Sequence, residues 1–188
     1  MASQIRIIGG QWKRSVLPVP DRDGLRPTPD RVRETLFNWL GQSLDGWRCL
    51  DVFAGTGALG LEAASRGAAS VTLLERDPGL IRHLQDSVRR LKAEAIVNVI
   101  RTDAARWLTR TPPVPQDLIL LDPPFRAGWV SRILPAVLPW RAPDGLIYVE
   151  SDEPLSDADL AQQGMDGLGV IRAGKAGQVH YHLLAPQA

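Results

Sequence analysis

Apolar residues recur at two different spacings along the chain. From Trp47 onward, short runs that are almost continuously apolar alternate with stretches in which apolar residues recur every three or four positions. The first pattern predicts strands buried on both faces, and the second predicts amphipathic helices. Strands are predicted at 48–53, 70–75, 96–100, 117–121 and 145–150, with two more near 168–173 and 178–184. Helices are predicted between them at 57–67, 78–93, 103–108 and 129–138.

This alternation is typical of a doubly wound α/β fold, in which a mostly parallel sheet carries helices on both faces. We predict such a domain, with seven strands, over residues 47–188, preceded by a small extension over residues 1–46. Ligands of these sheets bind beyond the carboxyl ends of the strands. The residues that follow each predicted strand are therefore the first candidates for chemistry.

The extension follows a different pattern. Residues 4–8 and 12–17 flank a Gly-Gly-Gln sequence and predict a β-hairpin. A stretch rich in proline and arginine follows. Thr28 is then predicted to cap a helix in which Pro29 is the first residue. Apolar residues at helical spacing extend this amphipathic helix over residues 29–43.

The composition is that of an ordinary globular chain of 188 residues, with a formal net charge of +1 and a pI of about 8.0. This balance neither requires nor excludes a nucleic-acid partner. The single cysteine, Cys49, suits a reducing compartment and permits no internal disulfide. His83, His180 and His182 lack cysteine partners, so no metal site is expected. Since the sequence has no long apolar run and no charged-then-apolar leader, we expect a soluble, cytoplasmic protein. We also expect a monomer.

A glycine-rich segment joins the first strand of the α/β domain to its helix. The sequence LDVFAGTGALG places Gly55, Gly57 and Gly60 in GxGxxG spacing. Glycines let the backbone turn tightly and let a ligand approach the main chain at the start of a helix. The spacing alone serves a dinucleotide, another adenosine cofactor or close packing.

Acidic residues around this loop narrow the choice of cofactor. Asp51 lies inside the preceding strand, where a carboxylate favours a cofactor with an ammonium group and a sulfonium centre over a pyrophosphate. Glu75 ends the next strand and can accept hydrogen bonds from both hydroxyls of a ribose. Asp103 follows the third strand, where it can accept from an adenine amino group or cap a helix. Glu75 suits NAD and S-adenosylmethionine equally, whereas Asp51 favours S-adenosylmethionine.

The fourth strand ends in a sequence that no strand can continue, Asp122-Pro123-Pro124-Phe125. The prolines fix φ and remove two backbone donors, which leaves carbonyl groups as acceptors. A nucleobase amine is a poor nucleophile because its lone pair is delocalised, so it must be held and aimed at an activated methyl group. Asp122 and the carbonyl of Pro123 supply two acceptors, and Phe125 supplies a stacking face. An ordinary proline turn is the alternative.

These motifs resemble those of S-adenosylmethionine-dependent amino-group methyltransferases. The sequences IRIIGGQWKRSVLPVP, GLRPTPDRVRETLFNWL, GLIYVE and KAGQVHY extend the similarity over nearly the whole chain to one branch. That branch is the RsmD family of bacterial 16S rRNA guanine-N2 methyltransferases, which modify guanine 966. The resemblance implies a Rossmann-like class I methyltransferase fold and S-adenosylmethionine as cofactor, with S-adenosylhomocysteine as product. It also implies 16S rRNA in a partly assembled small ribosomal subunit as substrate.

The resemblance assigns roles to individual residues. The turn that holds the amine is Asp122, Pro123, Pro124 and Phe125. The residues expected to contact the cofactor are Asp51, Phe53, Ala54, Gly55, Thr56, Gly57, Glu75, Arg76, Asp103, Ala104 and Asp122.

Basic residues are concentrated before the α/β domain. Residues 1–33 contain seven basic and three acidic side chains, a net charge of +4, whereas the whole chain carries +1. Arginines beside glycine and proline suit contacts with phosphate groups. The candidate RNA contacts are Lys13, Arg14, Arg26, Arg31, Arg33 and Arg126. Solvated charges on a lid over the core are the alternative, and Arg26 and Arg31 can order such a lid over the cofactor.

Three other functions stay open. The chain can be an amino-group methyltransferase acting on adenine N6 or on a protein glutamine, although Asp122 and the N-terminal match weigh against this. An NAD-dependent oxidoreductase would use the same glycine loop, but no convincing proton-transfer residue follows a strand. A non-catalytic RNA-binding protein would not need Asp51, Glu75 and Asp122 together.

Overall fold

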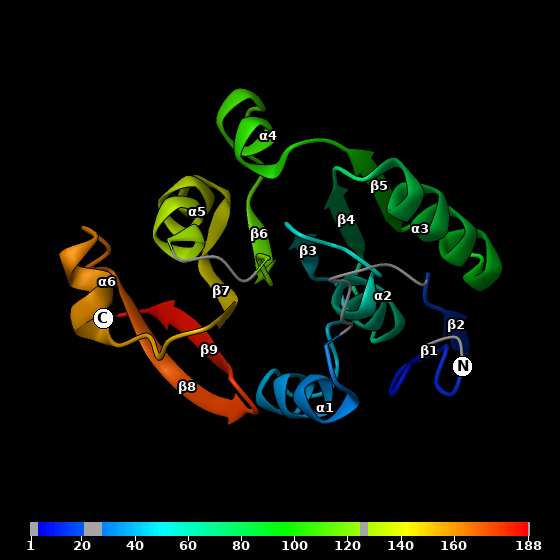
Figure 1. The fold of residues 1–188 in the computed structure, drawn as a ribbon, viewed down its shortest axis with the longest axis horizontal. Coiled ribbons are helices and arrows are strands. Elements are labelled where there is room, and N and C mark those ends of the chain that lie inside the picture. The colour runs from blue at the N-terminus through cyan, green and yellow to red at the C-terminus, as the bar shows by residue number, and fades with distance from the viewer. Residues whose placement is uncertain (1–3, 21–27, 125–127, 188) are drawn as a thin grey trace. The chain divides into compact units, whose positions relative to one another are not determined.

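The computed structural model describes residues 4–20, 28–124 and 128–187, and the chain divides into two compact units, Met1–Ala104 and Ala105–Ala188 (Figure 1). Seven strands form a mixed, mostly parallel sheet, to which the first unit contributes three strands and the second unit four. The seven-stranded α/β architecture is therefore confirmed. The division at residue 46 stays a prediction.

The N-terminal hairpin is present, with shorter strands than predicted. Strand β1 (Gln4–Arg6) pairs antiparallel with β2 (Val16–Pro18). Ile5 of β1 belongs to a buried cluster with Val19 and Ala58. Because Ala58 begins the helix after the glycine loop, the hairpin shares hydrophobic core with that helix.

Helix α1 (Asp30–Trp39) is shorter at both ends than predicted. Pro29 is the N-cap, with a ψ of 147° that is not helical, so the helix begins one residue later than expected. The prediction that Thr28 caps the helix is therefore wrong. The helix ends before Gly41, whose φ of 88° is left-handed and terminates the helical geometry. It buries the apolar side chains of Val32, Leu36 and Phe37.

The first unit contains three parallel strands and two helices of the predicted α/β pattern. The strands are β3 (Arg48–Asp51), β4 (Ser70–Glu75) and β5 (Val97–Arg101), in the order β5-β4-β3, and the helices are α2 (Ala58–Ser65) and α3 (Pro78–Leu91). Helix α2 packs against β3 and β4, and α3 packs against β4 and β5. Cys49 of β3 is buried, with 1% of its surface exposed. Since the strands are parallel, their carboxyl ends lie at one edge of the sheet.

The second unit contains the other four strands of the sheet. They are β6 (Gln116–Leu121), β7 (Arg141–Ser151), β8 (Leu168–Ala176) and β9 (Val179–Pro186), in the order β6-β7-β9-β8. Strands β6 and β7 are parallel, whereas β9 runs antiparallel to both β7 and β8. This arrangement confirms the two closing strands predicted near residues 168–184.

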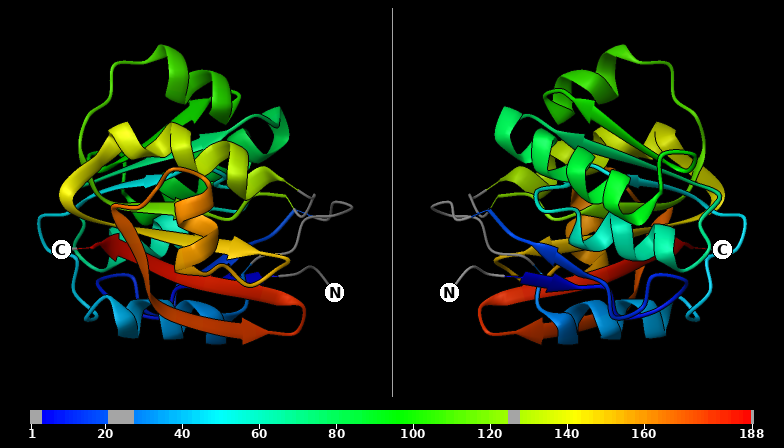
Figure 2. Two further views of the ribbon diagram at one scale, coloured as in Figure 1. Left: turned by 90° about the vertical axis from the view of Figure 1, so that its left-hand side faces the viewer. Right: turned by 90° about the vertical axis from the view of Figure 1, so that its right-hand side faces the viewer.

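The helices of the second unit are short. They are α4 (Ala104–Arg110), which begins at the last residue of the first unit, α5 (Trp129–Val137), the 3₁₀ turn η1 (Leu138–Trp140) and α6 (Asp157–Gln162). Helix α6 was not predicted, and it lies beside β8 (Figure 2). Trp107 of α4 stacks on Trp140, with ring centroids 4.4 Å apart. In the part of the chain that the structure describes, no helix has the length and apolar character needed to cross a membrane.

Candidate active site

The glycine loop lies between β3 and α2, as the sequence predicted. Gly55 and Gly57 adopt positive φ angles of 52° and 82°, which residues with a Cβ rarely adopt. Gly57 is the N-cap of α2 and therefore provides no capping side chain. Of the other loop residues, Ala54 and Thr56 are buried and Phe53 is half-buried. The loop thus brings main chain to the carboxyl end of β3.

Gly60, the third glycine of the motif, is required for packing. A Cβ at this position would lie 2.2 Å from Cδ2 of Leu73 and 3.0 Å from Oδ2 of Asp51. The amide of Gly60 donates to the same Asp51 oxygen at 3.0 Å. Asp51 is 1% exposed. This carboxylate therefore fixes the first turn of α2 onto β3.

Glu75 ends β4 and lies against the glycine loop. Its Oε2 accepts a hydrogen bond from the amide of Gly55 at 3.0 Å, and its Oε1 accepts from the amides of Arg76 and Asp77, both at 2.8 Å. The carboxylate is half-buried and fixed in orientation. Each carboxylate oxygen has two lone-pair sites. Glu75 therefore has acceptor capacity left for a ligand beside the loop.

Three predicted acids lie at or just beyond the carboxyl ends of three neighbouring parallel strands. Asp51 ends β3, Glu75 ends β4, and Asp103 lies two residues beyond Arg101, the partner of Glu75 on β5. Asp103 is exposed and directly precedes α4, whose first residue, Ala104, is buried. Both roles considered for Asp103, adenine contact and helix cap, are compatible with this position. The sheet topology thus gathers the predicted cofactor residues at one edge of the first unit.

The Asp-Pro-Pro turn belongs to the second unit. Strand β6 ends at Leu121, which is fully buried and pairs with Val149 of β7. Asp122 is half-buried, Pro123 is buried and Pro124 is exposed. Predicted contacts at Phe125 and Arg126 lie outside the described residues. The described part of the turn therefore presents one carboxylate and one exposed proline directly beyond a core strand.

A cavity of about 200 Å³ opens beside this turn. It is lined by Pro123 and Pro124, by the first turn of α5, by residues 150–155 at the end of β7, and by Asp159 and Gln163 of the α6 region. Sequence analysis did not single out Glu150, although it is a charged residue in an otherwise apolar strand. Glu150 lines the cavity and is 3% exposed.

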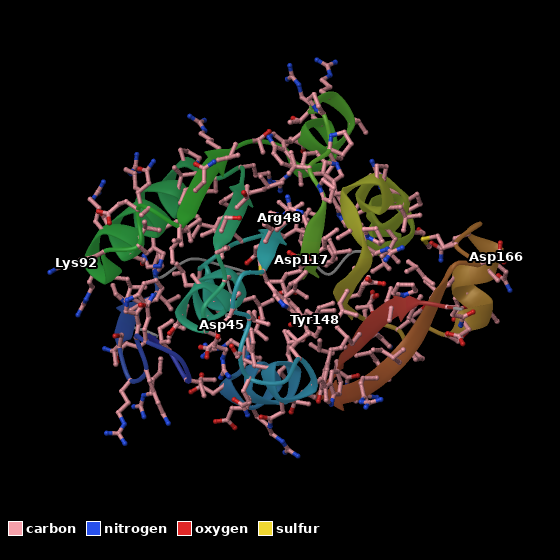
Figure 3. All side chains as sticks on the ribbon, turned by 180° about the vertical axis from the view of Figure 1, so that it is seen from behind. Asp45, Arg48, Lys92, Asp117, Tyr148 and Asp166 are labelled. Atoms are coloured by element: carbon pink, nitrogen blue, oxygen red, sulfur yellow. The ribbon has the colours of Figure 1, made fainter. Side chains whose placement is uncertain are left out.

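Tyr148 holds the carboxylate of Glu150. The Tyr148 hydroxyl donates to Oε1 of Glu150 at 2.9 Å, and the tyrosine, labelled in Figure 3, is fully buried. Burial raises the pKa of Tyr148 well above its usual value, and the charge of Glu150, the hydrogen bond to it and the charge of Asp122 act in the same direction. The hydroxyl therefore keeps its proton at neutral pH and remains a donor.

The predicted RNA contacts differ in exposure. Lys13, Arg14 and Arg31 are exposed. Arg14 lies in the bend of the N-terminal hairpin with a positive φ of 72°. Arg26 lies outside the described residues. The exposed members can therefore reach a phosphate group without rearrangement of the core.

Arg33 requires a correction, because its side chain is 1% exposed. Its guanidinium donates to Oε2 of Glu62 at 3.2 Å, to the carbonyl of Arg6 at 2.9 Å and to the carbonyl of Thr28 at 3.3 Å. A guanidinium engaged in this way is not available to RNA. Arg33 instead connects α1 to the hairpin and to α2.

Glu62 is the acceptor at the centre of this network, and sequence analysis did not identify it. It is fully buried on α2 and accepts from the amides of Ile8 and Gly9 at 2.9 and 2.8 Å. Arg66 donates to its Oε1 at 2.8 Å. A lone acid within the small apolar run GALGLEAAS was the available signal, because such a group is buried only with partners.

Among the residues that the structure describes, no group of three or more His, Cys, Asp or Glu side chains is arranged to hold a metal ion.

The fold is the Rossmann-like fold of class I methyltransferases. A solved structure of a putative methyltransferase from Escherichia coli matches with a TM-score of 0.84 and 41% identity, and the match covers 98% of this chain and 99% of that one. The chain belongs to the family described as Conserved hypothetical protein 95, the RsmD family, whose family model matches residues 5–185. This assignment confirms the resemblance found in the sequence motifs.

Curated relatives match over most of the chain. The ribosomal RNA small subunit methyltransferase D of Escherichia coli K12 is 42% identical over 100% of this chain and 92% of its own length. The protein of the same name from Haemophilus influenzae is 41% identical over 81% of this chain and 82% of its own length. The match to the Escherichia coli protein spans the whole of this chain and therefore includes the segments of the glycine loop and the Asp-Pro-Pro turn.

Proposed function

We propose that the protein transfers a methyl group from S-adenosylmethionine to the exocyclic N2 of a guanine in 16S rRNA, the base equivalent to guanine 966. Relatives named ribosomal RNA small subunit methyltransferase D support methyl transfer to rRNA as the activity. The choice of guanine N2 comes from the motifs that resemble the RsmD family. The proposed substrate is a partly assembled small ribosomal subunit in the cytoplasm, and the proposed enzyme is a monomer.

The cofactor is S-adenosylmethionine, and the edge of the first unit suits it. Glu75 is fixed beside Gly55, and its Oε2, which accepts from the Gly55 amide, has one lone-pair site left for a ribose hydroxyl. Asp51, buried at the end of β3, supplies the negative charge that suits the cofactor's amino group. Asp103 and Ala104 are proposed at the adenine, and Arg76 beside the ribose. Bound there, the cofactor supplies a methyl group on a positively charged sulfur, which needs no further activation.

The observation that carries the proposal is the Asp-Pro-Pro turn at the end of β6. Asp122 supplies a carboxylate. Pro123 supplies a carbonyl group, and neither proline of the turn can donate a hydrogen bond to it, because proline has no N–H group. We propose that these two acceptors hold the two N–H groups of the target amine and aim its lone pair at the methyl group. Orientation of this kind can lower the barrier greatly without a further acid or base. Asp122 or solvent receives the proton that the product nitrogen loses.

Lys13, Arg14 and Arg31 are the proposed contacts to RNA phosphates. All three are exposed and lie in the segment with a local charge of +4. Arg26, Phe125 and Arg126 remain part of the proposal on sequence grounds alone. Phosphate contacts position an RNA but do not read its sequence. Selection of one base must therefore come from the site around the turn and from the shape of the assembled particle.

The direct test is identification of the methylated nucleoside. Small ribosomal subunits lacking the modification are incubated with the protein and isotope-labelled S-adenosylmethionine, and their RNA is digested to nucleosides. The expected product is N2-methylguanosine in 16S rRNA. Label in N6-methyladenosine or in a protein glutamine would contradict the proposal. A thermal shift with NADH and none with S-adenosylhomocysteine would contradict the cofactor as well.

A further inference from the structure

We infer that Glu150 selects guanine at the active site by accepting a hydrogen bond from N1–H of the target base. This inference rests on the proposed function and names the residue that would give it base specificity. Asp122 and Pro123 hold the amine that is methylated, but every purine with an amine at the correct place satisfies them. A second acceptor is needed to tell guanine from such purines.

Glu150 of β7 lies next to the end of β6. Leu121, the last residue of β6, pairs in parallel register with Val149 of β7, so Glu150 follows this pair on β7 and Asp122 is the first residue beyond β6. Residues in register on neighbouring parallel strands point to the same face, and the strands lie about 4.8 Å apart. The effect of both charges on the Tyr148 hydroxyl agrees with this placement. The two carboxylates are therefore neighbours at one end of the sheet.

The side chains that line the cavity beside Glu150 suit a ligand that donates hydrogen bonds. It is lined by acidic and amide side chains together with the apolar surfaces of three prolines, Trp129, Val130 and Leu155. Within the described residues, no Lys, Arg or His lines it. A phosphate group would meet only repulsion from Glu150 and its acidic neighbours. A neutral base that offers N–H groups suits both the acceptors and the apolar walls.

Two acceptors line the cavity. Oε1 of Glu150 accepts from the Tyr148 hydroxyl, which fixes the orientation of the carboxylate, and a carboxylate has about four lone-pair sites in all. Oε1 of Gln163, which also lines the cavity, is buried with no hydrogen-bond partner among the described residues. A buried acceptor without a donor is costly, and a ligand that donates removes this cost. The cavity volume of about 200 Å³ suits a ligand of one or two rings.

The chemistry of purines makes the acceptor selective. Guanine carries a proton on N1 beside its N2 amine, so it presents donors to both Glu150 and Asp122. Adenine and 2-aminopurine have a lone pair on N1, and that lone pair would face the Glu150 carboxylate. 2-Aminopurine keeps the amine at C2. It differs from guanine only in lacking the N1 proton, which Glu150 is inferred to contact, and the O6 atom. Discrimination between these two bases is the property that Glu150 controls.

The test uses small-subunit particles reconstituted with either guanine or 2-aminopurine at the target position. Wild-type protein should methylate guanine at least about tenfold more efficiently, as kcat/KM, because the wrong base loses a hydrogen bond to a charged group. In Glu150→Gln the amide can also donate to N1 of 2-aminopurine, so the ratio of the two efficiencies should fall about tenfold. Glu94→Gln makes the same chemical change at an exposed position of the first unit and should keep the wild-type ratio. Tyr148→Phe, which releases the carboxylate, should lower the ratio in the same direction.

The possible results separate the two claims. Equal use of both bases by the wild-type protein, or the same ratio in Glu150→Gln and Glu94→Gln, would overturn the role of Glu150 while N2-methylguanosine formation stands. Failure of the wild-type protein to form N2-methylguanosine on the unmodified particle would instead contradict the proposed function. The wild-type comparison requires no variant, so equal use of both bases would overturn the inference even if Glu150→Gln does not fold.

Discussion

At the scale of single residues, Asp51 and Glu75 of the first unit stabilise the fold in addition to their proposed role in cofactor binding. Asp51 accepts from the amide of Gly60, and Glu75 accepts from three main-chain amides. Replacing either acid would disturb the glycine loop together with cofactor binding. Asp122 belongs to a turn in the other unit. It is therefore the better position for separating catalysis from cofactor binding.

Replacing Asp122 with alanine should abolish most turnover. Since the carboxylate is proposed to hold the reacting amine, kcat should fall by about 100-fold or more. Binding of S-adenosylhomocysteine, measured by calorimetry, should stay largely unchanged because the other residues expected to contact the cofactor are not altered. Asp144→Ala, at an exposed position of β7, is the matched control and should keep full activity. Undiminished turnover in Asp122→Ala would remove the mechanism.

Gly60→Ala should destabilise the first unit. The added methyl group would meet Leu73 at 2.2 Å, and overpacking of this kind costs about 1–3 kcal/mol of unfolding free energy. The comparison is Gly167→Ala, where no atom lies within 4 Å of the new Cβ. Denaturant titration should show a lower midpoint for Gly60→Ala and little change for Gly167→Ala. Equal midpoints would mean that α2 shifts at little cost.

At the scale of elements, the periodicity of apolar residues predicted the helices and strands that are specified by their own sequence. Strand β4 has the predicted bounds, Ser70–Glu75, because its apolar residues, interrupted only by Thr72, are bounded by Ser70 and Glu75. Helix α6 was missed because it is only six residues long and is specified by a capping box at Ser156 and Asp159 rather than by an apolar stripe. The start of α1 was misplaced by one residue because Pro29 fits both the cap and the first turn.

Contacts between distant residues were beyond such a prediction. The rule on strand ends correctly indicated that Asp51, Glu75 and Asp103 would share an edge of the sheet. No local signal shows that Arg33 pairs with Glu62, which is 29 residues away. Arg33 was therefore assigned to RNA with the other arginines. Glu150 was likewise treated as part of a strand, because its neighbour Asp122 comes from a different segment of the sequence.

The ion network on α2 should be a strong local determinant of stability. In Glu62→Gln, the buried guanidinium of Arg66 would lose its charged partner and that of Arg33 would keep only Asp30; breaking a buried pair costs about 3–5 kcal/mol. Asp86→Asn removes the partner of Arg89 in an exposed pair and should cost less than about 1 kcal/mol. Unfolding free energies from denaturant titration compare the two. Similar small losses would show that the network contributes little.

Acid should weaken the second unit through His182. Burial lowers the pKa of this imidazole below its ordinary value of 6.5, and the charge of His180 acts in the same direction against a backbone hydrogen bond at Val149. Its Nε2 accepts from the amide of Leu155 at 3.0 Å, and protonation would remove this acceptor. The unfolded chain takes up the proton more readily, so the stabilisation is complete above about pH 6.5 and is lost as the pH falls below it.

His182→Gln provides the measurement, because glutamine offers an acceptor that does not titrate. The unfolding free energy of the wild-type protein should fall more steeply between pH 7.5 and 5.5 than that of the variant. Other groups, His83 among them, contribute the slope that both proteins share. Parallel curves for the two proteins would show that His182 does not sense pH.

At the scale of the whole molecule, the charge is unevenly distributed. The chain carries a net charge of only +1, yet residues 1–33 carry +4. Long-range attraction of the whole protein to RNA is therefore weak, and binding depends on where the basic side chains are placed. With Arg33 inside the protein, the exposed contribution of the described segment comes from Lys13, Arg14 and Arg31, together with Arg6.

Replacing Lys13, Arg14 and Arg31 together with glutamine should weaken binding to the small-subunit particle. The slope of log K against log salt concentration should become shallower by about 2–3, because each phosphate contact releases about one counterion. Cofactor binding should not change. The matched control replaces three exposed basic residues at the end of α3, Arg89, Arg90 and Lys92, with glutamine. An equal loss in both triple variants would indicate a general charge effect and no local contact.

The single thiol of the chain has a practical consequence. Cys49 lies inside β3, two residues before Asp51, and only 1% of its surface is exposed. A buried thiol is chemically inert until its surroundings open. The rate at which a thiol-reactive dye modifies Cys49 therefore reports the opening of this strand, without an engineered label. Ligands that bind only the closed form lower this rate by mass action. The rate at which Cys49 is modified can therefore be used to screen compounds that bind at the neighbouring glycine loop.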